Sequence, residues 1–84
     1  MIDGNSKTGT NNNGIYFDTV TNSKIDKLWV ENMKLYGIYL NNSSNQNTIS
    51  HNYVANSGSS GIHLNDASNN TVSGNHIENN INDD

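Results

Sequence analysis

The 84-residue chain has no cysteine, no arginine, few aromatic residues and few charges of either sign. Without cysteine, neither a disulfide framework nor a thiolate metal site can stabilise the fold. Four lysines against eight acidic residues give a net charge of −4, which excludes the basic surface of a nucleic-acid-binding protein. No apolar run approaches the ~20 residues of a membrane-spanning helix, so no membrane partner is expected.

Small polar residues dominate what is present. The chain contains 19 Asn, 10 Ser, 6 Thr and 7 Gly, which together make up half of its length. These residue types are poor helix formers and alanine occurs only twice, so a helical bundle is excluded. Because the charged fraction is only 14%, disorder caused by self-repulsion is excluded as well. The composition favours a β-rich chain in which asparagine has a specific role.

An internal repeat explains this composition. Three segments begin alike, at spacings of 23 and 24 residues: Gly14–Phe17, Gly37–Leu40 and Gly61–Leu64. A second block recurs at matching offsets in residues 25–32, 49–56 and 72–79, and the extra residue of the second unit falls in the polar stretch 41–48. Apolar and polar residues alternate within the blocks, which predicts short strands. Such units predict the coils of a parallel β-solenoid, with equivalent strands about 4.8 Å apart.

Equivalent residues of successive coils should form columns. Four aliphatic columns are predicted to point inward: Ile15/Ile38/Ile62, Phe17/Leu40/Leu64, Ile25/Ile49/Val72 and Val30/Val54/Ile77. A fifth inward column, of small residues near a corner, is predicted from Val20/Ser43/Ala67. The recurrent glycine that precedes a strand is expected to provide either a positive φ or a close approach of the backbone.

Two asparagine columns are predicted at turns. They are Asn52/Asn75, which Leu28 interrupts in the first coil, and Asn32/Asn56/Asn79. An asparagine side chain can bond the neighbouring backbone there and tolerates the left-handed conformation. Stacked asparagines can also bond to one another from coil to coil.

The second unit reads Gly-Ile-Tyr-Leu-Asn-x-Ser-x-Asn, followed by Thr-Ile-Ser-x-Asn-x-Val-x-Asn. This pattern resembles the right-handed parallel β-helix repeat of pectin-lyase-like proteins, NosD-type proteins, carbohydrate-active surface proteins and phage tailspikes, and the match covers about residues 14–82. The resemblance implies an all-β right-handed parallel β-helix of about three coils, residues 14–36, 37–60 and 61–84. Residues 1–13 would form an incomplete first coil and a polar loop. The resemblance also implies a scaffold associated with polysaccharides.

The candidate carbohydrate-binding residues form two outward columns. These are Tyr16/Tyr39/His63 and Trp29/Tyr53/His76. Rings in a row about 4.8 Å apart offer a flat surface for the apolar faces of sugars, with Asn and Ser supplying hydrogen bonds. The alternative is that the rings only stabilise neighbouring strands by stacking.

Catalysis by this chain alone is not expected. Of its carboxylates, only Asp26 with Glu31, or Glu78 with His76, could lie close together, and neither pair is typical of a glycosidase. Compared with enzymes of the resembled fold, the sequence lacks the paired-Asp and Gly-His-Gly signatures of polygalacturonases and the Asp-Pro-His-Glu run of alginate epimerases. It also lacks the arginine that pectate lyases use.

No metal or other cofactor is predicted. His51, His63 and His76 fall in three different columns, so they do not form a transition-metal site. Asp18 and Asp66 with loop carbonyls indicate calcium only weakly.

The function expected from the repeat is a β-helix scaffold segment of an extracellular, carbohydrate-associated protein of adhesin or phage-tail type. It would bind a polysaccharide or glycan at a cell or virion surface and would not be catalytic. One alternative is a fragment of a polysaccharide lyase or glycoside hydrolase whose catalytic residues lie outside this chain, and another is a structural spacer. Because both ends of a three-coil stack expose strand edges, further coils of a longer chain or self-association through the ends are expected partners.

Overall fold

The computed structural model describes residues 2–4 and 13–81. These residues form ten short strands and no helix, so no helix among them could cross a membrane. The strands are β1 (Ile2–Asp3), β2 (Ile15–Asp18), β3 (Lys24–Asp26), β4 (Trp29–Glu31), β5 (Ile38–Asn41), β6 (Thr48–Ser50), β7 (Tyr53–Ala55), β8 (Ile62–Leu64), β9 (Thr71–Ser73) and β10 (His76–Glu78).

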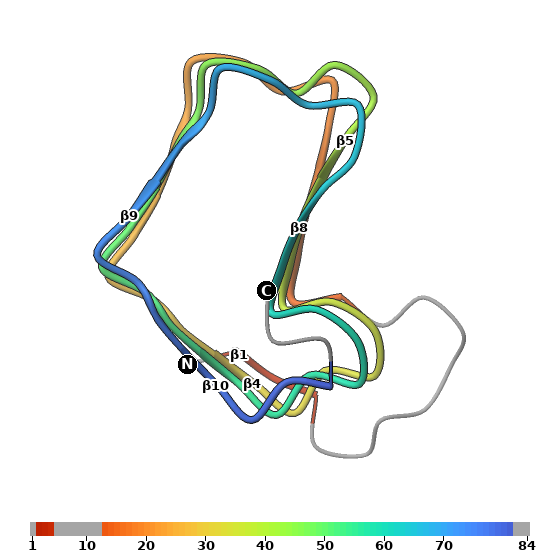
Figure 1. Ribbon diagram of the computed structural model, residues 1–84. Helices are drawn as coiled ribbons and strands as arrows, with labels where there is room; N and C mark the ends of the chain where they lie inside the picture. Colours follow the sequence, from red (N-terminus) through yellow and green to blue (C-terminus); the bar gives the residue numbers. More distant parts are fainter. Residues whose placement is uncertain (1, 5–12, 82–84) are drawn as a thin grey trace.

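The strands form three parallel sheets that are the walls of a solenoid. Sheet A has the order β1-β4-β7-β10, sheet B the order β2-β5-β8, and sheet C the order β3-β6-β9. Viewed along the solenoid, the coils overlap almost completely (Figure 1). The pairing register follows the sequence repeat, with Tyr16 opposite Tyr39 and Tyr39 opposite His63. The prediction of an all-β parallel β-helix is therefore confirmed.

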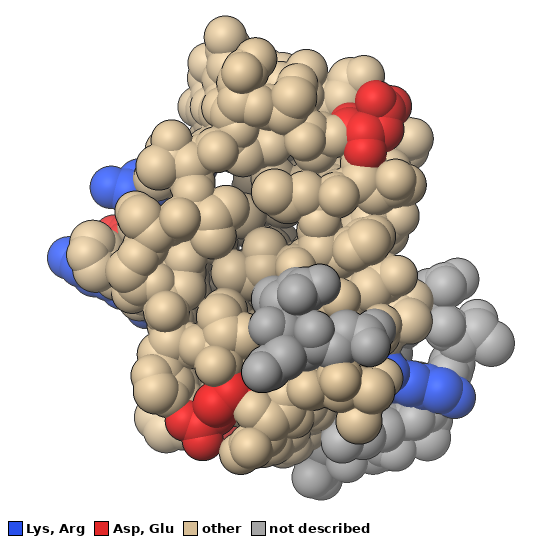
Figure 2. Space-filling view, in the orientation of Figure 1, with Lys and Arg blue, Asp and Glu red and all other residues tan. Residues whose placement is uncertain are grey.

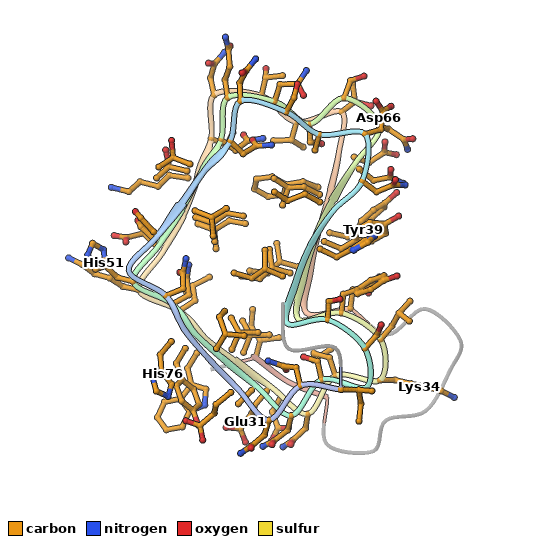
Figure 3. The ribbon with its side chains drawn as sticks, in the orientation of Figure 1. Glu31, Lys34, Tyr39, His51, Asp66 and His76 are labelled. Atoms are coloured by element: carbon orange, nitrogen blue, oxygen red, sulfur yellow. The ribbon has the colours of Figure 1, made fainter. Side chains whose placement is uncertain are left out.

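The core consists of the predicted aliphatic columns, which fill the interior as stacks, together with Met33, which was not predicted (Figure 3). It is tightest in the second coil, where four aliphatic side chains are 0% exposed: Ile38, Leu40, Ile49 and Val54. Their counterparts Leu64 and Val72 in the third coil are 40% and 44% exposed. No described strand lies beyond β8 and β9 in their sheets, so these side chains are covered from one side only.

The turns between strands use the left-handed backbone conformation repeatedly. Positive φ values recur at four corner columns: Thr19/Asn42/Asp66, Asn22/Gln46/Asn69, Lys27/His51/Gly74 and Asn32/Asn56/Asn79. The left-handed conformation predicted for the two asparagine columns is confirmed for Asn32/Asn56/Asn79, whose short polar side chains tolerate this region. It is wrong for Asn52/Asn75, which have no positive φ.

The recurrent glycine is required for close approach rather than for a positive φ. A Cβ atom on Gly37 would lie 2.4 Å from Val54 Cγ1 and 2.7 Å from the carbonyl oxygen of Gly61. Gly14 has the same surroundings one coil earlier. Among the described glycines only Gly74 has a positive φ. The backbones of successive coils therefore meet at this corner too closely for any side chain.

The predicted inward position of Ser43 was wrong by one residue. Ser43 is exposed with a φ of 64°, whereas Ser44 is 0% exposed and takes the inward position between Val20 and Ala67. The Ser44 hydroxyl accepts a hydrogen bond from the Val20 N–H (3.1 Å) and donates one to the Asn41 carbonyl (2.7 Å). Ser43 is thus the extra residue of the second coil, and the insertion bulges outward because only Ser44 has partners inside.

Inward-pointing asparagine side chains join the coils at the corner between sheets C and A. The side-chain carbonyl of Asn52 accepts from the N–H of Leu28 (2.9 Å), and that of Asn75 accepts from the N–H of Asn52 (2.9 Å). The amide groups of Asn52 and Asn75 donate to the carbonyls of Ile25 (3.1 Å) and Ile49 (2.9 Å). Each side-chain amide of this amide ladder therefore satisfies two backbone groups in the preceding coil.

A second amide ladder runs along the corner between sheets B and C. The side-chain carbonyl of Asn47 accepts from the Ser23 N–H (2.9 Å), and that of Asn70 accepts from the Asn47 N–H (2.8 Å). Asn80 bonds the Ser57 N–H (2.8 Å) in the same direction at a third corner. These bonds run from a side chain to the preceding coil, so the ladders have a direction, whereas the side chain of Asn45 accepts from the Ser68 N–H of the following coil (2.8 Å).

Candidate functional site

The two aromatic columns lie on different walls of the solenoid. Tyr16, Tyr39 and His63 come from the strands of sheet B, whereas Trp29, Tyr53 and His76 come from sheet A. The labelled side chains of Tyr39 and His76 point away from the interior on different sides of the molecule (Figure 3). The structure therefore does not unite the six predicted residues into one binding surface.

The sheet B column includes a ring that the repeat does not contain. Tyr36, from the turn before β5, stacks on His63 with a centroid distance of 4.4 Å and an interplanar angle of 7°. It also contacts Tyr39 at 4.8 Å. Tyr39 in turn lies 5.1 Å from Tyr16 and 5.2 Å from His63. Because Tyr36 has no equivalent in the other coils, periodicity alone could not identify it.

In the sheet A column, the rings at both ends bond glutamates of their own strands. The Trp29 indole N–H donates to Glu31 (2.5 Å), and His76 Nε2 bonds the Glu78 carboxylate. Tyr53 lies between these rings, 4.9 Å from Trp29 and 5.3 Å from His76. The stacking alternative describes this column well, because its rings contact one another and the Trp29 indole N–H and His76 Nε2 already have partners.

The ring faces do not form a flat outward platform. Tyr53 and His76 are inclined by only 10° at 5.3 Å, and Tyr36 and His63 by 7° at 4.4 Å. Nearly parallel rings this close cannot lie side by side in one plane, so they are stacked with an offset and cover part of each other's faces. A ligand would therefore meet ring edges along a column and a ring face chiefly at its end, where Tyr16 is 48% exposed.

One concave site adjoins this end of the sheet B column. It has a volume of about 390 Å³, and we call it the sheet B pocket. Its lining comes from strands β2 and β5 and from the turns before them: Asn13, Tyr16, Leu35, Tyr39 and Asn41. The sequence repeat identifies the two tyrosines but not the other three residues, which lie in turns or in a polar column without aromatic character. None of the described residues that line the pocket is charged.

The structure brings together only one of the two pairs of acid–base residues considered from the sequence. His76 and Glu78 are in contact. Asp26 lies on sheet C and Glu31 on sheet A, and each bonds other partners. These two carboxylates therefore do not form the pair that a glycosidase requires.

Asp26 instead links the first two coils at a surface corner. It accepts a hydrogen bond from the Ser50 hydroxyl (2.8 Å), and its carboxylate lies 3.2 Å from His51 Nδ1 and 4.0 Å from Lys24 Nζ. The Ser50 hydrogen bond makes the largest contribution to lowering the pKa of Asp26, and His51, Lys24 and Lys27 act in the same direction. This cluster joins coils and lies outside the sheet B pocket.

The described residues contain no group of three or more His, Cys, Asp or Glu side chains that could hold a metal ion. Asp18, considered for calcium, accepts hydrogen bonds from Asn42 (2.8 Å) and Thr19 (3.1 Å). Figure 2 shows lysine and acidic side chains in a few small groups around a mostly uncharged face.

Comparison with known proteins gives one match. A family profile described as a right handed beta helix region matches residues 1–84. Neither the curated proteins nor the solved structures gave a match to the chain. The profile match and the three stacked parallel sheets confirm the resemblance of the repeat to the right-handed parallel β-helix. The chain therefore belongs to the right-handed β-helix family.

Proposed function

We propose that this chain is a non-catalytic β-helix scaffold of an extracellular, carbohydrate-associated protein of adhesin or phage-tail type, and that it binds a glycan in the sheet B pocket. The observation that carries the proposal is the lining of this pocket. Two tyrosine rings and Leu35 provide apolar surface, and the amides of Asn13 and Asn41 provide hydrogen-bond donors and acceptors. An apolar concave site with a few polar groups is the usual form of a small-ligand site, and an aromatic ring can pack on the apolar face of a pyranose.

The proposal reduces the six aromatic candidates to two. The rings of Tyr16 and Tyr39 line the pocket. Trp29 and His76 are on another wall and bond Glu31 and Glu78, and one ring face of His63 is covered by Tyr36. Tyr16 and Tyr39 are thus the proposed contacts, and the sheet A column has a structural role.

The proposed ligand is an uncharged glycan. No lysine is among the described residues that line the pocket, so these residues offer no cation to an acidic polysaccharide. The closest charge along β2 is Asp18, whose strand partner is the pocket residue Asn41. A carboxylate at this position would repel uronic acids and sulfated sugars. Neutral sugars avoid this repulsion and can use the two amides.

A glycan array with neutral and acidic oligosaccharides tests the proposal. We expect binding to neutral glycans that Tyr16→Ala weakens at least about tenfold, the effect of losing roughly 1.4 kcal/mol of contact. Tyr53→Ala, the matched control on sheet A, should bind as the unmodified chain does. Circular dichroism would confirm that both variants are folded. Equal binding by the two variants, or binding only to acidic glycans, would contradict the proposed site, and release of reducing ends would favour a hydrolase or lyase instead.

A further inference from the structure

The C-terminal end of the solenoid, formed by β8, β9 and β10, is an incompletely covered surface. Leu64 and Val72 are 40% and 44% exposed here, whereas Leu40 and Ile49, their counterparts in the second coil, are 0% exposed. In sheets B and C the described residues provide no strand beyond β8 and β9. The same faces of the first two coils are each covered by the following coil.

The amide ladders specify which polar groups lie on this surface. In both earlier coils, the backbone N–H groups at two ladder corners point toward the next coil and are bonded by its asparagine side chains. The corresponding N–H groups of the third coil belong to Asn70 and Asn75. The same repeat assigns two carbonyl acceptors, those of Ala67 and Val72, as the counterparts of Val20 and Ile25 in the first coil.

We propose that this end is a docking surface for another β-helix coil that carries asparagine at both ladder corners. Each of its two asparagine side chains would accept from one N–H, of Asn70 or Asn75, and donate to one carbonyl, of Ala67 or Val72. Its aliphatic residues would cover Leu64 and Val72. This inference does not depend on the glycan site, because the pocket lies on the outer side of sheet B at the opposite end of the stack.

The N-terminal end of a second copy does not fit this surface. The first coil has Ser23 and Leu28 at the two ladder corners, where the later coils have asparagine. Leucine can neither accept from the Asn75 N–H nor donate to the Val72 carbonyl. Docking of this end would therefore leave backbone groups desolvated without a partner, at about 1–3 kcal/mol for each group.

The charge of the third coil also restricts its partner. Residues 61–81 contain the carboxylates Asp66 and Glu78 and no lysine, whereas all four lysines lie within residues 1–34. Two copies joined through their C-terminal ends would bring carboxylates of like charge together. The surface therefore fits an uncharged or lysine-bearing coil.

A chain extended by one coil provides the test. A copy of residues 37–60 placed directly after Asp83, in place of Asp84, continues the 23-residue spacing of a coil without the insertion. The copy is uncharged and carries the asparagines copied from Asn47 and Asn52. We expect hydrogen exchange at the backbone amides of Asn70 and Asn75 to slow by about tenfold or more relative to the 84-residue chain. The amides of Asn47 and Asn52, which are already bonded, serve as the internal measure of folding.

Single substitutions in the added coil distinguish hydrogen bonding by its asparagines from simple shielding of the end by any coil. With alanine in place of the asparagine copied from Asn52, the Asn75 amide should lose its protection while the Asn70 amide keeps it. The variant with alanine in place of the other copied asparagine should show the reverse pattern. Equal protection of both amides in all three extended chains would overturn the proposed role of asparagine. The 84-residue chain is also measured at several protein concentrations. If protection of its Asn70 and Asn75 amides from hydrogen exchange rises with concentration, the occupant is a second copy, and the proposed asparagine-bearing coil is overturned.

Discussion

The side chain of Asn52 reaches back across one coil to Leu28, whose backbone N–H it accepts at 2.9 Å. The same side chain donates to the carbonyl of Ile25 and is only 2% exposed. Two buried backbone groups of the first coil thus depend on one side chain of the second. Short coils with few aliphatic residues need such bonds, because backbone groups at their corners are buried without a strand partner.

Replacement of Asn52 should therefore weaken the fold strongly. We expect Asn52→Ala to lower the free energy of unfolding by about 2–4 kcal/mol, since it leaves the N–H and the carbonyl without partners. Urea denaturation followed by circular dichroism measures the loss. Asn65→Ala is the matched control, because the Asn65 side chain is exposed and, among the described residues, bonds only the side chain of Asn41, so a loss below about 0.5 kcal/mol is expected. Similar losses in both variants would argue against the ladder.

The two adjacent serines should respond differently to the same substitution. Ser44→Ala removes the acceptor of the Val20 N–H in a site that is 0% exposed, and we expect a loss of about 1–3 kcal/mol. Ser43→Ala changes an exposed side chain in the bulge and should cost less than about 0.5 kcal/mol. Thermal unfolding of both variants provides the comparison. A larger effect at Ser43 would place the insertion elsewhere.

Close approach at Gly37 gives a steric prediction. The Cβ of Gly37→Ala would lie 2.4 Å from Val54 Cγ1, so the coils must separate, and we expect a destabilisation of about 1–3 kcal/mol in urea denaturation. The control is Gly74→Asn, at a corner with positive φ that asparagine tolerates and where the nearest atoms belong to the flexible His51 ring. Its stability should stay within about 0.5 kcal/mol of the unmodified chain. Equal effects at the two glycines would contradict the distinction between them.

The lowered pKa of Asp26 predicts sensitivity to acid. The unfolded chain binds this proton more tightly than the folded chain, so protonation favours unfolding. The stabilisation is complete above the ordinary aspartate pKa near 4 and is lost as the pH falls through the lower pKa of the folded state. We expect the melting temperature of Asp26→Asn to fall less between about pH 5 and about pH 3 than that of the unmodified chain.

Asp66→Asn is the control for this measurement, because Asp66 is exposed and the asparagine suits its positive φ. Its melting temperature should retain the pH dependence of the unmodified chain. A pH dependence that Asp26→Asn leaves unchanged would mean that Ser50 and His51 do not stabilise the ionised carboxylate.

The strands and their register were predictable because identical spacing in three units fixes which residues stack. Ile15, Ile38 and Ile62 share a column in the sequence repeat and in the structure. The position of the insertion was not predictable, since Ser43 and Ser44 are the same residue type and only the buried hydrogen bonds distinguish them.

The candidate site was harder to predict than the fold. Periodicity identified Tyr16 and Tyr39, but it cannot show how the rings of one column are inclined to each other, by 33° for this pair. Tyr36 and Leu35 belong to a turn that the other coils do not copy in sequence. Their place beside the tyrosines depends on the path of that turn, which no repeat encodes.

The direction of the amide ladders has a consequence for synthesis of the chain on the ribosome. Residues emerge from the N-terminus, and at two corners each coil leaves N–H groups that side chains of the following coil bond. At every stage of translation the ladder bonds of the most recently emerged coil are therefore incomplete, and the next 23 or 24 residues complete them. The solenoid therefore grows from its N-terminal coil, and each coil is stabilised by the coil that follows it.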